Sequence, residues 1–273
     1  YLIDNNHKTI VVMKPKKGLQ KIKDQEEADK LKAYKDSLSE EEVKKLVEET
    51  KQLKASQEEA STKEELEKVG DICLKHNVLV VSDEIHADFV FKGKHQVFAA
   101  IKKEYEDITM TCTAPSKTFN LAGLALSNIF IPNRKLKHRF KAELSAAGTN
   151  LLGVMGLVAC QTAYEKGEEW YCAMKSYVKA NIEFTKQYVQ EKLPGVKMID
   201  HEGTYLVWLD FRDTGLNVDE LEDLIIHKAK LWLDSGKIFG KSGEGFQRIN
   251  VACPRSTVKE ALDRIRVALM EIS

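Results

Sequence analysis

Long apolar runs are absent from this sequence of 273 residues. None approaches the roughly 20 consecutive apolar residues that a helix needs to cross a bilayer. The N-terminal residues also lack the basic and then apolar pattern of a secretory signal peptide. We therefore expect a cytoplasmic protein without a membrane partner.

An excess of charge of either sign is also absent, because 42 basic residues are balanced by 42 acidic ones. Such a chain has no general field that would attract nucleic acid, so none is expected as a partner. The five cysteines show no C-x-x-C spacing, which indicates reduced thiols rather than a disulfide framework or a zinc site. What the chain does have is 43% hydrophobic residues, enough for one large core or two modest ones.

The first part of the chain is dominated by charged side chains. From Lys14 to Lys68 about half of the residues are charged, and the apolar ones follow narrow helical stripes. One helix is expected over residues 21–36, and a second after the S-x-x-E capping box that Ser39 opens. Together they predict a charged helical hairpin. The β-branched run from His7 to Lys14 predicts a strand before it.

This part resembles the helical linker of presequence-degrading zinc metallopeptidases. The resemblance is carried by the D-N-x-H-K start at Asp4 and by the L-x-x-x-T-x-x-L-x-x-x-Q helix that begins at Leu46. The zinc motif of that family, H-x-x-E-H, does not occur in the sequence. We therefore expect residues 1–63 to be structural and not to hydrolyse peptides.

At Thr62 the pattern changes to helices that alternate with apolar strands. Thr62 and Glu65 form a capping box, and Val78–Ser82 is an apolar run typical of a strand buried on both faces. Helix followed by buried strand is the unit of a parallel sheet, so this part predicts an α/β fold. Further strands are expected over residues 108–113, 126–131, 196–212 and 246–252, and further helices over 168–192, 218–233 and 257–272.

Two polar motifs each follow a predicted strand, which is where ligands bind in open α/β sheets. They are Ser-Asp-Glu-Ile-His, from Ser82 to His86, and Ala-Pro-Ser-Lys-Thr-Phe-Asn, from Ala114 to Asn120. Taken singly, a lysine after a strand is usually a surface residue, and Ser-Asp-Glu is often a helix cap. Together they resemble the fold-type I pyridoxal-phosphate enzymes of the class I and II aminotransferase family.

The resemblance implies the cofactor pyridoxal 5'-phosphate and a role for each matched residue. Lys117 would bind the cofactor covalently and act as general base, and Asp83 would pair with the protonated ring nitrogen. His86 would lie near the phenolic oxygen, and Ser116 is a local hydroxyl for the phosphate. The arginine of Phe246–Arg255 that would bind the substrate α-carboxylate matches Arg248, whose planar fork suits a carboxylate. Arg255 is expected to be a surface residue.

Within this family the motifs are most similar to the cystathionine β-lyase branch. Aminotransferases usually carry a hydroxyl residue and an arginine where this chain has Ala114 and Ala125. The resemblance implies elimination of a thiol from a small sulfur-containing amino acid, giving pyruvate and ammonia, in a possible homodimer. An aminotransferase with the same cofactor is the alternative enzyme, and a non-catalytic fusion or interaction protein is the alternative of another class.

The expected organisation has three parts. Residues 1–63 form the strand and charged helical hairpin, residues 64–185 a truncated large domain with a parallel-rich sheet, and residues 186–273 a smaller α+β domain. Family members are longer on the N-terminal side of the Asp83 strand, where they carry a glycine-led helix that holds the phosphate. We therefore expect weak binding of the cofactor by this chain.

Overall fold

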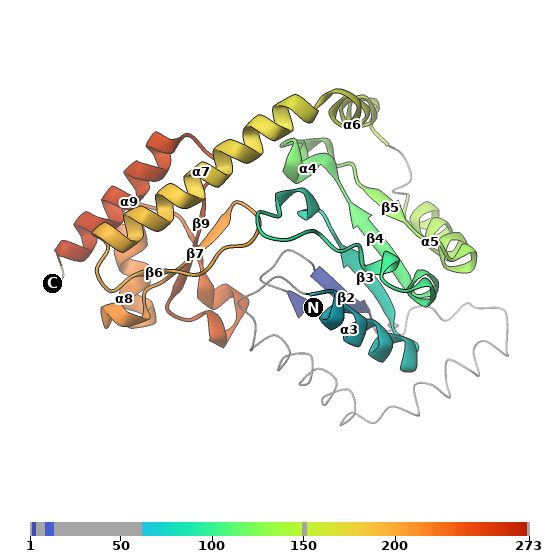
Figure 1. Ribbon diagram of the computed structural model, residues 1–273, viewed down its shortest axis with the longest axis horizontal. Coiled ribbons are helices and arrows are strands. Elements are labelled where there is room, and N and C mark those ends of the chain that lie inside the picture. Colours follow the sequence, from blue (N-terminus) through green and yellow to red (C-terminus); the bar gives the residue numbers. More distant parts are fainter. Residues whose placement is uncertain (1, 4–8, 14–61, 149–151, 272–273) are drawn as a thin grey trace. The chain divides into compact units, whose positions relative to one another are not determined.

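The computed structural model describes residues 2–3, 9–13, 62–148 and 152–271. These residues belong to two compact units, which are described separately below (Figure 1). The first unit comprises Tyr1–Ile85, His95–Ala114 and Leu126–Gly153, and the second His86–Lys94, Pro115–Ala125 and Val154–Ser273. The predicted helical hairpin lies outside the described residues, and the predicted domain bounds at residues 63 and 185 stay predictions.

The first unit is built on a five-stranded sheet in the order β1-β2-β3-β4-β5. Its strands are β1 (Leu2–Ile3), β2 (Thr9–Met13), β3 (Leu79–Asp83), β4 (Thr109–Thr113) and β5 (Asn128–Phe130). All the strands that the sequence predicted here are confirmed. The sheet is mixed, because among the described strands only β3 and β4 are a parallel pair. Parallel neighbours need a crossover connection, and the segment between β3 and β4 is the one that supplies it.

The burial of β3 differs from the prediction. Val80 and Ser82 are fully buried, whereas Leu79, Val81 and Asp83 are only partly buried. One face of β3 therefore carries the core and the other does not, although the run of apolar residues predicted burial on both faces. The physical reason is that the sheet is mixed, since strands are buried on both faces mainly in sheets whose strands all run parallel.

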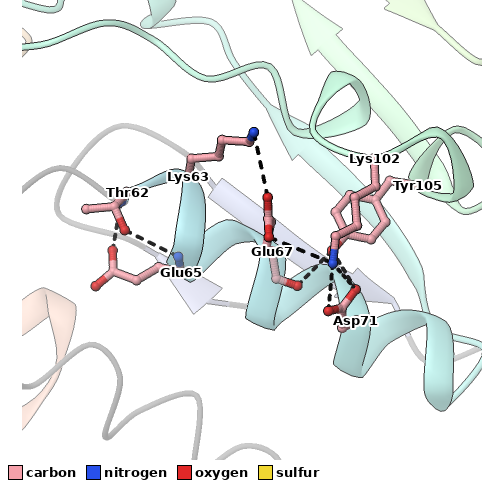
Figure 2. Close-up of polar contacts among 7 residues, drawn as sticks. All are labelled: Thr62, Lys63, Glu65, Glu67, Asp71, Lys102 and Tyr105. Carbon is pink, nitrogen blue, oxygen red and sulfur yellow. Dashed lines mark hydrogen bonds and ion pairs between the residues drawn. The ribbon is translucent and has the colours of Figure 1, made fainter.

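Helix α3 (Lys63–Lys75) begins where the sequence predicted, at the capping box of Thr62 and Glu65 (Figure 2). The Lys102 amine lies 2.8 Å from a carboxylate oxygen of Asp71, and the Tyr105 hydroxyl donates to the same carboxylate at 2.8 Å. The Tyr105 ring lies against Gly70, where a Cβ would come within 2.2 Å of it. The helix is thus fixed to the 3-10 turn at Lys103–Asp107 and closes a small core of Leu66, Cys73, Val80, Phe98 and Tyr105.

Two of the longer helices of the structure were not predicted. Helix α5 (Arg134–Ala146) is capped by Asn133, whose side chain accepts from the backbone of Lys135 and Leu136, and it has no buried residue. Helix α6 (Val154–Lys166) carries apolar residues on all sides and buries only Gly156 and Cys160. Helix α6 lacks the single apolar stripe by which an amphipathic helix is recognised, whereas α5 has a narrow one made by Leu136, Phe140 and Leu144.

The second unit contains an antiparallel sheet in the order β6-β7-β9-β8. The strands are β6 (Lys197–Met198), β7 (Leu206–Asp210), β8 (Asp234–Ser235) and β9 (Phe246–Asn250). The long helix α7 (Glu168–Lys192) and the C-terminal helix α9 (Arg255–Met270) lie side by side and pack against this sheet (Figure 1). The core between the two helices and the sheet includes Val178, Ile182, Val207, Leu209, Ile249, Leu262 and Ile265.

The predicted helix over residues 218–233 is shorter than expected. Helix α8 (Val218–Asp223) begins at a capping box of Asn217 and Glu220 and continues as a π-helical turn over Leu224–Lys228. Lys230 then has a positive φ of 54°, a backbone conformation that a right-handed helix does not contain. Among the described residues, no helix is both long enough and apolar enough to cross a membrane.

Candidate functional site

Asp83 is the last residue of β3, in the first unit. It lies opposite Cys112 in the parallel register of β3 and β4, and its carboxylate accepts from the backbone N–H of Ile85 at 3.3 Å. Burial raises the pKa of the Cys112 thiol, and the negative charges of Asp83 and Glu84 raise it further. The two carboxylates therefore bring concentrated negative charge to the end of this strand.

Glu84 is buried, with 2% of its surface exposed. Its carboxylate accepts hydrogen bonds from the Ser82 hydroxyl at 2.9 Å and the Phe98 backbone at 3.1 Å, and lies 2.6 Å from Nε2 of His95. Burial alone would raise the pKa of Glu84, but the interactions with His95 and Phe98 outweigh it and the pKa is lowered. Glu84 therefore has a structural role next to Asp83 and is not solvated.

Lys117 lies in the second unit, in the four-residue helix α4 (Pro115–Thr118). Pro115 suits the first position of a helix, where no partner for an N–H is needed. The Phe119 ring anchors the turn, 5.7 Å from the Trp170 ring and 6.1 Å from the Tyr164 ring. Lys117 and Ser116 are partly buried, and no described residue of the second unit forms a hydrogen bond or ion pair with the Lys117 amine.

The loop His86–Lys94 is attached to α4 and to the segment before β7. The Thr118 hydroxyl donates to the Asp88 carboxylate at 2.6 Å, and the Tyr171 hydroxyl donates to the Asp88 carbonyl at 2.7 Å. The Thr204 backbone N–H donates to the Phe89 carbonyl at 2.8 Å. These bonds hold the loop that carries His86 against the turn that carries Lys117.

His86 lies near two positively charged side chains, those of Lys117 and Arg248. Its ring lies 5.8 Å from the Tyr205 ring in an edge-on arrangement. Burial lowers the pKa of His86 to about 4, and the positive charges of Lys117 and Arg248 contribute to the same shift. An imidazole with this pKa is neutral at physiological pH. The charges of Lys117 and of Arg248 thus both reach His86.

Arg248 lies on β9 and is partly buried, with 24% of its side chain exposed. Its Nε and Nη2 atoms donate to one oxygen of Asp234, at 3.1 and 2.7 Å. The guanidinium lies 4.6 Å from the centre of the Phe239 ring and 5.7 Å from that of Trp208. Burial raises the pKa of the nearby Tyr205 phenol, whereas the Arg248 charge acts to lower it.

The second unit contains four of the five predicted site residues: His86, Ser116, Lys117 and Arg248. Asp83 belongs to the first unit, so its predicted approach to Lys117 stays a prediction. Arg255 donates from Nε to the Asn181 side chain at 2.8 Å, which joins α9 to α7 and gives it a structural role.

Sequence reasoning missed two residues of this region, Tyr205 and Asp234. The sequence places Tyr205 only within the strand region expected over residues 196–212, whereas in the structure the preceding Thr204 is buried and has a positive φ of 59°. A β-branched residue in that conformation marks strain of the kind found at functional sites. No local signal marks Asp234, because its partner Arg248 is brought to it by strand pairing.

Comparisons with known proteins identify the families to which parts of this chain are similar. The model of the family "Aminotransferase class I and II" matches residues 59–265, and that of the family "Peptidase M-16C associated" matches residues 13–75. Both expected resemblances are thereby confirmed. The two matches overlap in a segment that contains α3, the helix fixed to Lys102 and Tyr105.

The curated relatives include several cystathionine β-lyases. Cystathionine beta-lyase PatB of Bacillus subtilis (strain 168) is 41% identical over 209 residues, which are 76% of this chain and 54% of that protein. Cystathionine beta-lyase of Corynebacterium glutamicum is 35% identical over 212 residues, again 76% of this chain and 55% of that protein. The chain spans about half the length of the curated relatives it matches.

Solved structures show the same similarity. Cystalysin from Treponema denticola, which contains a pyridoxal 5'-phosphate cofactor, has a TM-score of 0.75 and 38% identity, covering 78% of this chain and 55% of that one. A PLP-bound putative aminotransferase from Clostridium difficile 630 has a TM-score of 0.75 and 44% identity, covering 77% and 55%. The fold is thus that of fold-type I enzymes, and the chain belongs to the class I and II aminotransferase family.

Proposed function

We propose that this protein acts as a pyridoxal-phosphate-dependent carbon–sulfur β-lyase of the cystathionine β-lyase type. The observation that carries the proposal is that the Thr118–Asp88 hydrogen bond of 2.6 Å holds the loop of His86 against the turn of Lys117, while the positive charge of Arg248 acts on His86. These are the residues that the family resemblance assigns to the cofactor and to the substrate carboxylate. The cystathionine β-lyases among the relatives support the choice of reaction.

The residues of the second unit fit the cofactor at its reactive end. Covalent attachment needs an amine that is not engaged in a hydrogen bond or ion pair. Among the described residues of the second unit, none forms such a contact with the Lys117 amine. His86 is kept neutral, so it can donate or accept a hydrogen bond without adding a third positive charge. Ser116, next to Lys117, is the candidate hydroxyl for the phosphate, and Asp83 the candidate partner of the ring nitrogen.

The chain's own residues would then divide the reaction between them. Arg248 binds the α-carboxylate of the amino acid and so orients its Cα–H bond. The Lys117 amine removes the Cα proton, and the thiolate leaves Cβ with the electron pair of its C–S bond. The cofactor, when bound, supplies an electron sink for the charge that develops at Cα. Hydrolysis of the remaining fragment gives pyruvate and ammonia, so no net oxidation or reduction occurs.

Transamination is the second candidate, since aspartate aminotransferase of Pyrococcus abyssi is 29% identical over 213 residues. The Ala114 and Ala125 positions favour the lyase, because aminotransferases of this class usually have a hydroxyl residue and an arginine there. Ala125 ends the 3-10 turn after Asn120 with a left-handed backbone, at a φ of 49°. The two reactions differ in one requirement, because only transamination needs a keto-acid acceptor.

Assay of pyruvate and thiol from L-cystathionine tests the proposal. Protein supplied with pyridoxal phosphate, and with no keto acid, is expected to release both products, and Lys117→Ala to release neither. The control Lys103→Ala removes an amine that is paired to Glu106 on the exposed surface of the first unit, and should leave the rate unchanged. Product that forms only after a keto acid is added would instead indicate an aminotransferase.

A homodimer is part of the same proposal. Helix α6 exposes large apolar side chains, with Val154 72% and Met155 71% exposed. Contiguous exposed apolar surface favours a protein contact. The molar mass in solution, measured by light scattering, should be twice that of the chain, and substitution of both residues by Ser should lower it.

A further inference from the structure

The partner of Arg248 gives a further residue to the site. Asp234 on β8 lies directly opposite Arg248 on β9 in the antiparallel register, so both side chains project from the same face of the sheet. The contact is built by the backbone, because the pairing of two strands fixes the distance between these side chains.

The ion pair occupies one edge of the guanidinium. Nε and Nη2 both donate to the same Asp234 oxygen, at 3.1 and 2.7 Å. A guanidinium has five N–H donors, so three remain, one on Nη2 and two on Nη1. One N–H from each of these nitrogens points along the end of the guanidinium, where a carboxylate can accept two parallel hydrogen bonds.

Two aromatic rings lie around the guanidinium. The Phe239 ring centre is 4.6 Å from the Arg248 guanidinium carbon and the Trp208 ring centre 5.7 Å. The two rings are 5.2 Å apart and nearly perpendicular, at 76°. They limit tilting of the guanidinium, and Asp234 limits its rotation about the side chain.

A small cavity also borders the pair. Its volume is about 220 Å³, and its lining includes Asp234 and Arg248 together with Ile249 and the α9 residues Thr257, Val258 and Ala261. The Asp234 side chain is 48% exposed, and an ion pair with this exposure contributes little to stability. The Asp234–Arg248 ion pair is therefore better explained as a contact that orients Arg248 than as one that stabilises the fold.

We propose that Asp234 is a positioning residue, which holds Arg248 by its Nε edge and so directs the end of the guanidinium at the α-carboxylate of the amino-acid substrate. The inference rests on the proposed function in that Arg248 is taken as the carboxylate-binding residue. It goes beyond that function by giving the orientation of Arg248 a cause within this chain.

The variants Asp234→Ala and Asp234→Asn test it, because Asn keeps an acceptor oxygen and Ala does not. For elimination from L-cystathionine, Asp234→Ala is expected to raise KM by about tenfold or more with a much smaller change in kcat, as expected for a misplaced binding group. Asp234→Asn should recover most of the loss. The control Asp213→Ala, which removes the partner of the exposed Lys197, should leave KM unchanged.

A binding measurement separates failure of this inference from failure of the proposed function. The NMR signal of the Arg248 Nε–H, identified by its loss in Arg248→Lys, is followed while L-alanine is added as a probe that has no leaving group. If L-alanine binds more weakly to Asp234→Ala than to the wild type, and Asp234→Asn recovers the affinity, the positioning role is supported even if no pyruvate is formed. Equal or tighter binding to Asp234→Ala, or no binding of L-alanine at Arg248 in the wild type, overturns it.

Discussion

The substitution Glu84→Gln is expected to destabilise the first unit by about 1.5–3 kcal/mol, the usual contribution of a hydrogen bond to a charged group. The carboxylate of Glu84 is buried, and its Oε1 atom accepts from Ser82 and Phe98 while Oε2 meets Nε2 of His95 at 2.6 Å. An amide keeps the Oε1 acceptor, so the loss is confined to the charge-assisted contact with His95.

The same substitution should change the dependence of stability on pH. The folded-state pKa of Glu84 is lowered, so its contribution is present above the unfolded pKa of about 4.3 and is lost as pH falls through the folded value. The difference in free energy of unfolding between wild type and variant should therefore be largest near neutral pH and shrink below about pH 4.

Urea unfolding, followed by fluorescence at several pH values, measures this difference. The control Glu106→Gln removes an exposed carboxylate that contacts Lys103 at 2.6 Å in the same unit. It should change stability by less than about 0.5 kcal/mol. If Glu84→Gln unfolds at the same urea concentration as Glu106→Gln at neutral pH, the buried network does not stabilise the end of β3 as argued.

Two further predictions concern packing and the ionisation of the site. Gly70→Ala places a Cβ within 2.2 Å of the Tyr105 ring and should lower the free energy of unfolding by about 1–3 kcal/mol. The control Gly123→Ala, where a Cβ has nothing within 4 Å, should have no comparable effect. Equal urea midpoints for the two variants would contradict the packing of Gly70 against Tyr105. His86, with a pKa of about 4, should remain neutral in an NMR titration from pH 8 to pH 5. Lys117→Met should raise the pKa of His86 by removing one of the charges that lower it, and an unchanged titration curve would mean that the two side chains do not interact. Because the folded-state pKa of His86 lies below its unfolded value, its neutral form contributes stability that is lost as pH falls from about 6.5 toward 4.

The parts of the fold that the sequence predicted well are those with local chemical signals. The capping box of Thr62 and Glu65 marks the start of α3, and the acidic start and Pro194 after the end give α7 its bounds. The β-branched and apolar runs mark the strands for the same reason. Helix α6 was missed because its apolar residues do not form one stripe.

The parts that could not be predicted depend on contacts between distant segments. Lys117 and Arg248 could be assigned from motifs, but the pairing of Arg248 with Asp234 needs the register of β8 on β9. Tyr205 reaches His86 only because the loop His86–Lys94 pairs with the segment around Gly203. The sequence therefore indicates which residues are candidates for the chemistry, and strand pairing decides which side chains hold them in place.

The most direct test of the central claim is to locate the cofactor on the chain. Protein is incubated with pyridoxal phosphate, its absorbance is recorded, and the complex is reduced with borohydride before peptide mass spectrometry. Because weak binding is expected, we predict a visible absorbance band that needs a large excess of cofactor and that Lys117→Ala lacks. After reduction, the cofactor should be found on the peptide that contains Lys117 and on no other lysine. A cofactor distributed over surface lysines, or a band that persists in Lys117→Ala, would contradict the assignment of this site.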